Sequence, residues 1–562
     1  MLEGRRLVWL VFAGVLAFHA AANAVWLRQN GERCAGFPFH LRHLVPAMDQ
    51  YEDLRKGTPL PRFIATLSED VWRPAPLHSF CTAVGFLLTG RDIVLVTWVL
   101  NIAYLALALL GVLALSSGLG HAAEVGIRAM ILFSLYPAVY GLSRLYGGFD
   151  FQVMAVMPWA AWAGLRTDGF VSRRACLVLA LVVSAGLLLK DTFAGYFVPV
   201  FLAAAAVSLA KSFDKAKLAN MALGAGLVAG LVFFYYSAPV IMAKELTGIL
   251  HEASGPWYAF DSWKVYTLGL SETLMSPPFL LLFLCSLAWF LLRGRSEAGF
   301  WVLVPWILAP WALIFFMPHF KQPSYFVPIL PAAAIVSSLA LHRLPQQAGR
   351  VLMIVLAGVG LLQFMASSFG AGDGLGRFRL WRFSNGYELT YFKPDPGIVY
   401  HKGDAVPFDR HRDAASRVAA MGTGPGMKER VLVLQSPGGI HENHHAYDLL
   451  DFLHGWRFET TGTFGGMLRG GFLNETYDRV IFPMKQGWDI RRYVDAVHAD
   501  SMHVARKTNP SWTPEYMSAV EAVDPAVLAG RLERFLEPFT VKERLGTDGE
   551  NELWLLSRPG KP

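Results

Sequence analysis

The chain has 562 residues, of which 54% are hydrophobic and only 17% are charged. Soluble proteins carry about 25% charged residues, and disordered chains are poorer in apolar residues than this one, so composition excludes both classes. The formal net charge is +7, and in a chain this apolar we take the excess of Lys and Arg as a signal of membrane topology rather than of nucleic-acid binding.

The N-terminal region predicts one membrane span and then a long loop. The apolar run 7–26 follows Arg5 and Arg6, which places the N-terminus in the cytoplasm. Ala22-Asn23-Ala24 also fits a signal-peptide cleavage site, so a cleaved leader is the alternative, and the next loop lies outside in either case. Residues 27–91 form this first outer loop, and the apolar run 79–90 within it is too short to cross a bilayer. We therefore expect that run to be an interfacial or re-entrant juxtamembrane helix.

The region up to residue 369 is a near-continuous series of apolar runs, which predicts an α-helical polytopic membrane domain, 1–369, with about 11 to 13 spans. With 79–90 kept out of the count, nearly every basic cluster between spans falls on the cytoplasmic side, as the positive-inside rule requires. A second outer loop, 243–275, is rich in Trp and Tyr and is either a gating segment or an interfacial anchor. The spans that we expect are 7–26, 92–115, 124–143, 149–166, 175–190, 193–210, 218–240, 276–293, 299–317, 322–341 and 351–369.

The C-terminal region, 370–562, is predicted to be a soluble α/β domain outside the cytoplasm, because polar residues return there and no run is long enough to span a membrane. Residues 429–439, 477–484 and 551–559 have strand character, whereas 447–456 and 525–539 have helix character. The boundary is the glycine-rich stretch 369–378.

Two other patterns do not predict a site. His441-Glu442-Asn443-His444-His445 matches the zinc-protease pattern H-E-x-x-H, but two glycines stand where the required helix would already run, so we expect a polar loop. Cys34 and Cys81 both fall on or near the outer loop and are either disulfide-bonded or buried as thiols.

Ionisable residues from distant parts of the chain converge on the outer membrane face in this topology. A carboxylate there can take a proton from a hydroxyl, and a cation can hold a phosphate leaving group, so the two together suit transfer from a phosphate-activated lipid. For any single residue, the alternative is an anchor or a loop ion pair. The residues are Asp49, Glu52, Asp53, Glu69, Asp70, Arg144, Asp150, Lys190, Asp191, His319 and Lys321.

Several motifs, in this order, resemble the GT-C superfamily of polytopic glycosyltransferases, in its bacterial branch with lipid A aminoarabinose transferase and protein O-mannosyltransferase-like enzymes. The resemblance covers about residues 1–370 and is most specific in "FKQPSYFVPILP", a Lys-x-Pro-x-Tyr-x-x-Pro stretch. The other motifs are Asp49-Gln50-Tyr51-Glu52 in the first loop, "RPAPLHSFCTAVGFLLTG" at 73–90, "YPAVYGLSRLYGGFDFQVMA" at 136–155 and "GLLLKDTFAGYFVP" at 186–199.

The resemblance implies inverting transfer of a sugar from a polyprenyl-phosphate donor to a hydroxyl of an envelope lipid, glycan or protein. It implies that Asp49 is the catalytic base of the first loop and that Asp150 is the second acidic residue. Because Gln50 follows Asp49 directly, Glu52 and Asp53 remain alternatives for the base. The candidates for binding the donor phosphate are Lys190, Lys321, Arg144, His319 and Tyr325.

A metal ion and two other functions stay open at this stage. Mg²⁺ or Mn²⁺ held by Asp49 and Asp150 is conceivable, since hard cations bind carboxylates without a fixed spacing. A transporter or flippase of a lipid-linked sugar would place its polar residues at mid-bilayer, and a non-catalytic envelope assembly subunit would need no lipid groove. We expect a multi-pass protein of the bacterial inner membrane with its C-terminal domain in the periplasm, and no nucleic-acid partner.

Overall fold

A computed structural model gives the arrangement of most of the chain. It describes residues 2–31, 34, 38–59, 76–146, 149–237, 267–297, 299–316, 323–370, 379–382, 388–391, 412, 415–417, 431–434, 450, 458–460, 477–485, 487–508, 523–546 and 551–559.

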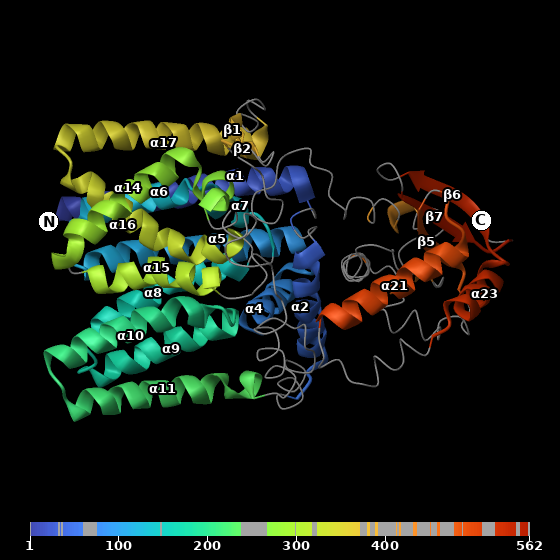
Figure 1. The fold of residues 1–562 in the computed structure, drawn as a ribbon, viewed down its shortest axis with the longest axis horizontal. Helices are drawn as coiled ribbons and strands as arrows, with labels where there is room; N and C mark the ends of the chain where they lie inside the picture. The colour runs from blue at the N-terminus through green and yellow to red at the C-terminus, as the bar shows by residue number, and fades with distance from the viewer. Residues whose placement is uncertain are drawn as a thin grey trace.

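Residues up to 370 form a bundle of long helices that run roughly side by side (Figure 1). The helices are α1 (Leu2–Asn30), α2 (Pro38–Lys56), α4 (Pro76–Thr89), α5 (Ile93–Gly118), α6 (Ala123–Ser134), α7 (Pro137–Leu142), α8 (Phe149–Arg166), α9 (Arg173–Leu189), α10 (Phe193–Lys211), α11 (Lys215–Tyr236), η2 (Leu270–Met275), α14 (Pro277–Arg293), η3 (Gly294–Ser296), α15 (Phe300–Phe316), η4 (Pro323–Ile329), α16 (Leu330–Arg343) and α17 (Gln346–Phe369).

Seven helical stretches in the described part of the chain are long and apolar enough to cross a membrane. Two shorter apolar helices, Pro76–Thr89 and Phe300–Ala312, accompany them. The prediction of an α-helical polytopic membrane protein is therefore confirmed. The seven are Arg6–Asn30, Ile93–Gly118, Phe193–Lys211, Lys215–Tyr236, Pro277–Ser296, Pro323–Arg343 and Gln346–Phe369.

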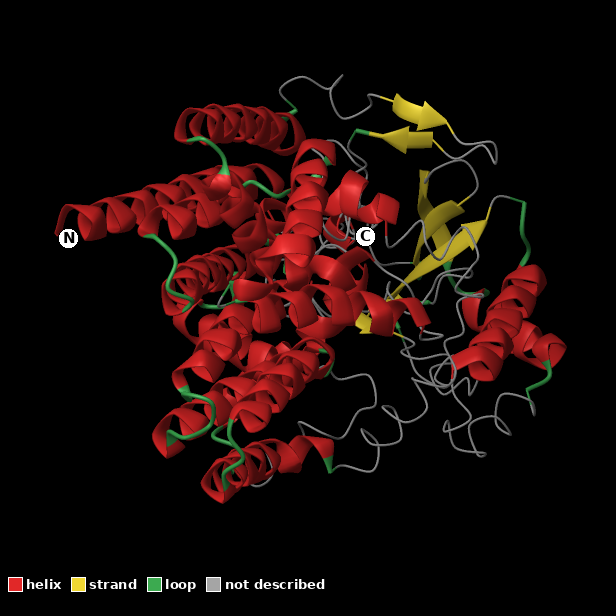
Figure 2. Cartoon of the chain, turned by 60° about the vertical axis from the view of Figure 1, so that its left-hand side comes forward, coloured by secondary structure: helices red, strands yellow, loops and turns green. Residues whose placement is uncertain are grey.

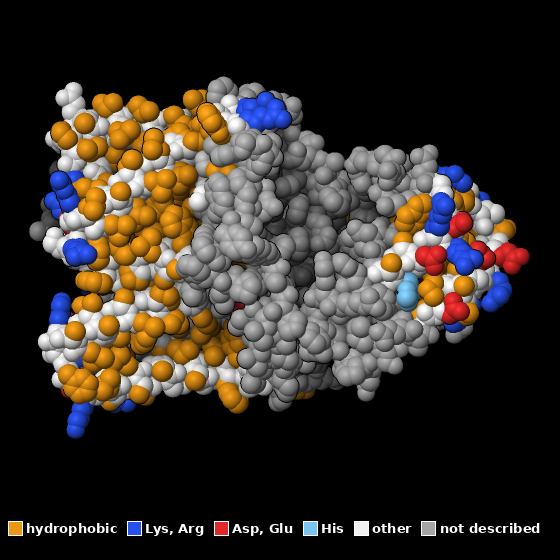
Figure 3. Space-filling model, viewed as in Figure 1, with side chains coloured by type: hydrophobic (Ala, Val, Ile, Leu, Met, Phe, Trp, Pro, Cys, Tyr) orange, Lys and Arg blue, Asp and Glu red, His pale blue; other side chains and the backbone are white. Residues whose placement is uncertain are grey.

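The surface of the bundle has the pattern expected of a protein in a bilayer. Apolar side chains cover the helices between their ends, and Lys and Arg gather at the end where the N-terminus lies (Figure 3). The helix order explains this, because α8 ends at Arg166, α9 begins at Arg173, α10 ends at Lys211 and α14 ends at Arg293. We call this the basic end of the bundle and the opposite end the site end.

Two details of the bundle differ from a simple series of spans. The predicted span 124–143 is divided into α6 and α7 at Pro137, which lacks the N–H that a continuous helix needs and instead begins α7. Helix α4 has 14 residues and is about 21 Å long at 1.5 Å per residue, which is too short to cross the hydrocarbon core. It packs against α2, as a juxtamembrane helix would.

The C-terminal region carries a five-stranded sheet with the order β4-β3-β5-β7-β6. Figure 2 draws the strands of the chain in yellow, apart from the helical bundle. Strand β3 (Val431–Val433) pairs in parallel with β4 (Phe458–Thr460) and β5 (Arg479–Lys485), whereas β7 (Asn551–Ser557) pairs antiparallel with β5 and with β6 (Thr540–Gly546). A separate hairpin, β1 (Arg379–Arg382) with β2 (Glu388–Thr390), follows α17. This mixed sheet confirms the α/β character predicted for the region.

The two faces of the sheet pack differently, because side chains alternate along a strand. Leu432, Val480 and Phe482 face α21 (Ile490–Thr508) and α23 (Pro525–Leu536) in one core. Val431, Val433 and Ile481 on the other face belong to the hydrophobic cluster that also contains α2. The stretch 441–445 and most of the predicted helix 447–456 lie outside the described residues.

Candidate functional site

An ion pair between Asp150 and Lys190 lies at the site end of the bundle. The Nζ atom of Lys190 donates a hydrogen bond to Oδ1 of Asp150 at 2.7 Å. The side chain of Asp150 is 9% exposed and that of Lys190 is 21% exposed. The carboxylate is therefore buried behind a cation that solvent or a ligand can still reach.

The sequence places both partners at helix ends. Asp150 is in the first turn of α8, where the helix dipole favours a negative charge. Lys190 is the C-cap of α9 and has extended backbone angles, so the chain turns there into α10. Gly186 makes this turn possible, because a Cβ atom at 186 would lie 2.5 Å from the ring of Phe193.

Tyr325 of η4 also lies close to Lys190. The Nζ atom of Lys190 is 5.3 Å from the centre of the Tyr325 ring, within the range of a cation–π interaction. The hydroxyl of Tyr196 donates a hydrogen bond to the backbone oxygen of Tyr325 at 2.5 Å and fixes η4 against α10. The structure thus brings together Asp150, Lys190 and Tyr325, three residues predicted from the sequence.

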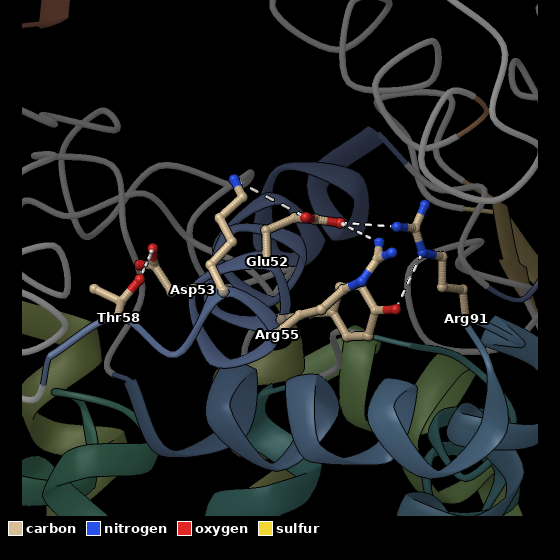
Figure 4. Close-up of polar contacts among 7 residues, drawn as sticks. Glu52, Asp53, Arg55, Thr58 and Arg91 are labelled. Carbon is tan, nitrogen blue, oxygen red and sulfur yellow. Dashed lines mark hydrogen bonds and ion pairs between the residues drawn. The ribbon is translucent and has the colours of Figure 1, made fainter.

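The three carboxylates of the first loop lie on α2 and have different surroundings, and Figure 4 shows two of them, Glu52 and Asp53. Asp49 is exposed. Glu52 accepts a hydrogen bond from Arg91 at 2.8 Å and lies within ion-pair range of Arg55 and Lys56. Asp53 accepts a hydrogen bond from the Thr58 hydroxyl at 3.0 Å, which closes the turn after the helix. Glu52 and Asp53 are thus held by side chains of α2 and of the segments next to it, whereas Asp49 is the most exposed of the three carboxylates.

The buried face of α2 belongs to the same hydrophobic cluster as the segment just before Asp150 in the chain. Ala47, Met48 and Tyr51 share one hydrophobic cluster with Leu145 and Tyr146. In the described part of the chain, the partner of Asp150 is Lys190 rather than a residue of α2. The carboxylates of α2 and α8 thus belong to one region of the fold without touching each other.

Arg144 has a different environment from Lys190. It is 3% exposed, and it donates hydrogen bonds to Oδ1 of Asn23 at 2.8 Å and to Oγ of Ser368 at 2.5 Å. No contact in the described structure joins it to Asp150 or Lys190. Arg144 is near these residues in sequence but belongs to a separate buried network.

Other predicted residues lie outside the described part of the chain, namely Glu69, Asp70, His319 and Lys321. Cys34 and Cys81 are both described and are not joined by a disulfide bond. Among the described residues, no three His, Cys, Asp or Glu side chains come together as a metal site. Asp49 and Asp150 accordingly do not assemble a metal centre with a third ligand there.

Sequence reasoning missed two groups of polar residues near the site. Asn23 and His19 are fully buried in α1, and their signal was a polar residue within an otherwise apolar span. Glu272 is a buried carboxylate, 3% exposed, on the π-helix η2, which packs against η4 and α7. No spacing pattern in the sequence indicates a π-helix, although such turns are common at functional sites.

No model of a known protein family matches this sequence, and no curated protein matches it. Among solved structures, ArnT from Cupriavidus metallidurans in the apo state is similar over 97% of this chain and 98% of that chain, with 14% sequence identity and a TM-score of 0.53. ArnT from the same organism bound to undecaprenyl phosphate gives the same values. The chain therefore has the same overall fold as these two ArnT structures.

Proposed function

We propose that this chain is a membrane glycosyltransferase of the GT-C type, which moves a sugar from a polyprenyl-phosphate donor to a hydroxyl of an envelope lipid, glycan or protein. The observation that carries the proposal is the partly exposed side chain of Lys190, paired with Asp150, at the site end of a bundle with this fold. The similar ArnT structure contains undecaprenyl phosphate, which supports a lipid-phosphate donor for this chain as well.

The reaction divides between a base and a phosphate site. The acceptor oxygen attacks the anomeric carbon, its proton passes to a carboxylate, and the bond from that carbon to the phosphate oxygen breaks with inversion. A lipid phosphate is already a good leaving group, so the protein has to stabilise the negative charge that grows on it rather than supply a strong acid. An ammonium has three N–H donors, so Lys190 can keep its bond to Asp150 and still bind a phosphate oxygen.

We assign the base to Asp49 and the role of holding Lys190 to Asp150. Asp150 fixes the position of the ammonium through the hydrogen bond of 2.7 Å that it accepts from Lys190. The ring of Tyr325 also supports Lys190. His319 and Lys321 remain candidates for further phosphate contacts, and Glu52 remains the alternative base.

We further propose that residues 1–369 form the catalytic domain and 370–562 a periplasmic domain, with the site end facing the periplasm of a bacterial inner membrane. The accumulation of Lys and Arg at the other end of the bundle supports this orientation, because positive residues stay in the cytoplasm.

The experiment is transfer of a labelled sugar from synthetic polyprenyl-phosphate donors by the purified full-length protein in lipid nanodiscs, with an envelope extract as acceptor. The account predicts covalent transfer with inverted anomeric configuration and release of polyprenyl phosphate. If liposomes with the protein instead move the intact donor across the bilayer without cleaving it, the protein is a transporter. Mass spectrometry of envelope glycolipids and glycoproteins with and without the protein identifies the acceptor.

A further inference from the structure

We propose that Arg144 is a positioning residue rather than a ligand of the donor phosphate, and that it joins α1 and the end of α17 to the segment ahead of Asp150. The expected loss of sugar transfer rests on the proposed function, whereas the role of Arg144 in joining the helices does not. It concerns a buried polar network that crosses three helices close to the site.

The guanidinium of Arg144 is enclosed by aromatic rings. Its central carbon lies 4.7 Å from the ring centre of Phe364, 5.6 Å from that of Tyr140, 5.9 Å from that of Phe369 and 6.0 Å from that of Trp26. Aromatic faces attract a desolvated cation, and this attraction offsets part of the cost of burying it. A phosphate cannot reach the guanidinium without separating these rings.

No carboxylate compensates the charge within the described residues, where Arg144 forms no ion pair. Two of its three nitrogens instead bond to neutral side chains from different helices, Asn23 of α1 and Ser368 of α17. The guanidinium is a rigid planar fork, so it holds two partners at a fixed angle, which a single ammonium cannot do. This geometry suits a joint between helices better than an anion site.

Further hydrogen bonds complete the joint on the side of Asp150. The amide of Asn23 donates to the backbone oxygen and to the hydroxyl of Ser143, at 3.1 and 2.9 Å. Asn101 of α5 donates to the backbone oxygen of Leu145 at 2.9 Å, and the backbone N–H of Tyr146 donates to the oxygen of Cys34 at 2.9 Å. The chain is therefore fixed at every step from Ser143 to Tyr146.

Asp150 follows this fixed segment at the start of α8. A shift of the end of α17 would move Arg144 and, through it, the point from which α8 begins. Such a shift would change the position of the carboxylate that holds Lys190. The rate of reaction is sensitive to displacements of this kind even when the displaced residue touches no substrate.

The test uses the full-length protein with Asn23→Ala, Ser368→Ala, both together, and Arg144→Lys. The lysine keeps the positive charge but lacks the planar guanidinium that can hold two partners. Ser338→Ala is the matched control, because its buried hydroxyl also donates to a backbone oxygen, that of Val125, at the basic end. Lys190→Gln reports loss of a phosphate ligand. The measurements are kcat and KM for transfer, binding of undecaprenyl phosphate, and amide hydrogen exchange over residues 142–150.

We expect each of the first four variants to lower kcat by about tenfold. The loss in the variant with both Asn23→Ala and Ser368→Ala should be much smaller than the product of the two single losses, because both residues act through Arg144. The affinity for undecaprenyl phosphate should stay within about twofold of wild type. We also expect faster exchange over 142–150, with none of these changes in Ser338→Ala. The inference is overturned if Arg144→Lys is fully active, or if Arg144→Lys loses phosphate affinity as Lys190→Gln does while Asn23→Ala and Ser368→Ala do not. Exchange does not depend on the reaction, so faster exchange in a protein that transfers no sugar overturns the proposed function and leaves the joint standing.

Discussion

Lys190 and Asp150 form a 2.7 Å ion pair although 40 residues of chain separate them. The pair exists because α8 and α9 form a helical hairpin. The start of α8, with Asp150, and the end of α9, with Lys190, therefore lie at the same end of the bundle. The carboxylate side chain is 9% exposed and the lysine side chain 21% exposed, so the lysine is the more accessible partner. The following predictions test the parts of this arrangement separately.

The ion pair contributes to stability as well as to the site. Lys190→Gln removes the partner of a carboxylate that is only 9% exposed, so we expect a loss of about 1–3 kcal/mol. The double variant Asp150→Asn with Lys190→Gln replaces the charges with neutral hydrogen-bonding groups and should regain most of the loss. Thermal denaturation in detergent checks this, and a double variant less stable than Lys190→Gln would show that the two side chains are not coupled.

Gly186 is required by the close approach of Phe193. We expect Gly186→Ala to destabilise the protein by about 1–3 kcal/mol and to lower transfer, because the new methyl group pushes the Phe193 ring and with it the turn at Lys190. Gly195→Ala is the matched control, since a Cβ atom at that helical position meets nothing within 4 Å. The control should be neutral or stabilising, as alanine favours a helix by up to about 1 kcal/mol over glycine. Equal effects of the two substitutions would contradict the packing argument.

The ring of Tyr325, rather than its hydroxyl, is predicted to support Lys190. Tyr325→Phe keeps the aromatic face 5.3 Å from the ammonium and should retain transfer within about threefold. Tyr325→Leu removes the face and should lower kcat/KM by about tenfold. Steady-state kinetics of both variants separate the two roles, because a hydroxyl that bonds the phosphate would make the Phe variant as defective as the Leu variant.

Much of the fold was predicted from the sequence because basic residues bracket the apolar runs. The predicted span 193–210 forms α10, Phe193–Lys211, which is long and apolar enough to cross a membrane. The predicted span 175–190 forms a helix, α9 (Arg173–Leu189), but α9 is not among the seven stretches that meet this criterion in the described part of the chain. The break at Pro137 was missed because the apolar run continues on both sides of it, and hydrophobicity alone does not register a lost hydrogen bond. In the C-terminal region, β5 and β7 were predicted from their apolar character, whereas β6 was not, since its sequence TVKERLG is largely polar.

The candidate site could be predicted only in part. Asp150 and Lys190 were found because ionisable residues beside a span are costly and therefore informative. Their pairing with each other depends on helix ends that meet in space, which no local pattern encodes. The environment of Arg144 also depends on distant residues, Asn23 and Ser368, so no local pattern distinguishes a buried joint from an exposed phosphate ligand.

The base is predicted to be Asp49, the exposed carboxylate of α2. Asp49→Asn should lower kcat by about 10²–10⁴-fold, the usual contribution of a general base, while Asp53→Asn should remain active. Glu52→Gln should change stability by less than about 1 kcal/mol, because its ion pair with Arg91 is partly exposed. The measurement is transfer kinetics of the three variants at equal expression, and full activity in all three would refute a base on α2.

The central claim is that a lipid phosphate binds at Lys190, and native mass spectrometry of the purified protein with undecaprenyl phosphate tests it most directly. Lys211→Gln is the control, since Lys211 is an exposed lysine at the basic end of the bundle. The account predicts that wild type and Lys211→Gln bind the lipid equally, while Lys190→Gln binds it at least about tenfold more weakly. Equal binding by Lys190→Gln and Lys211→Gln would contradict the account.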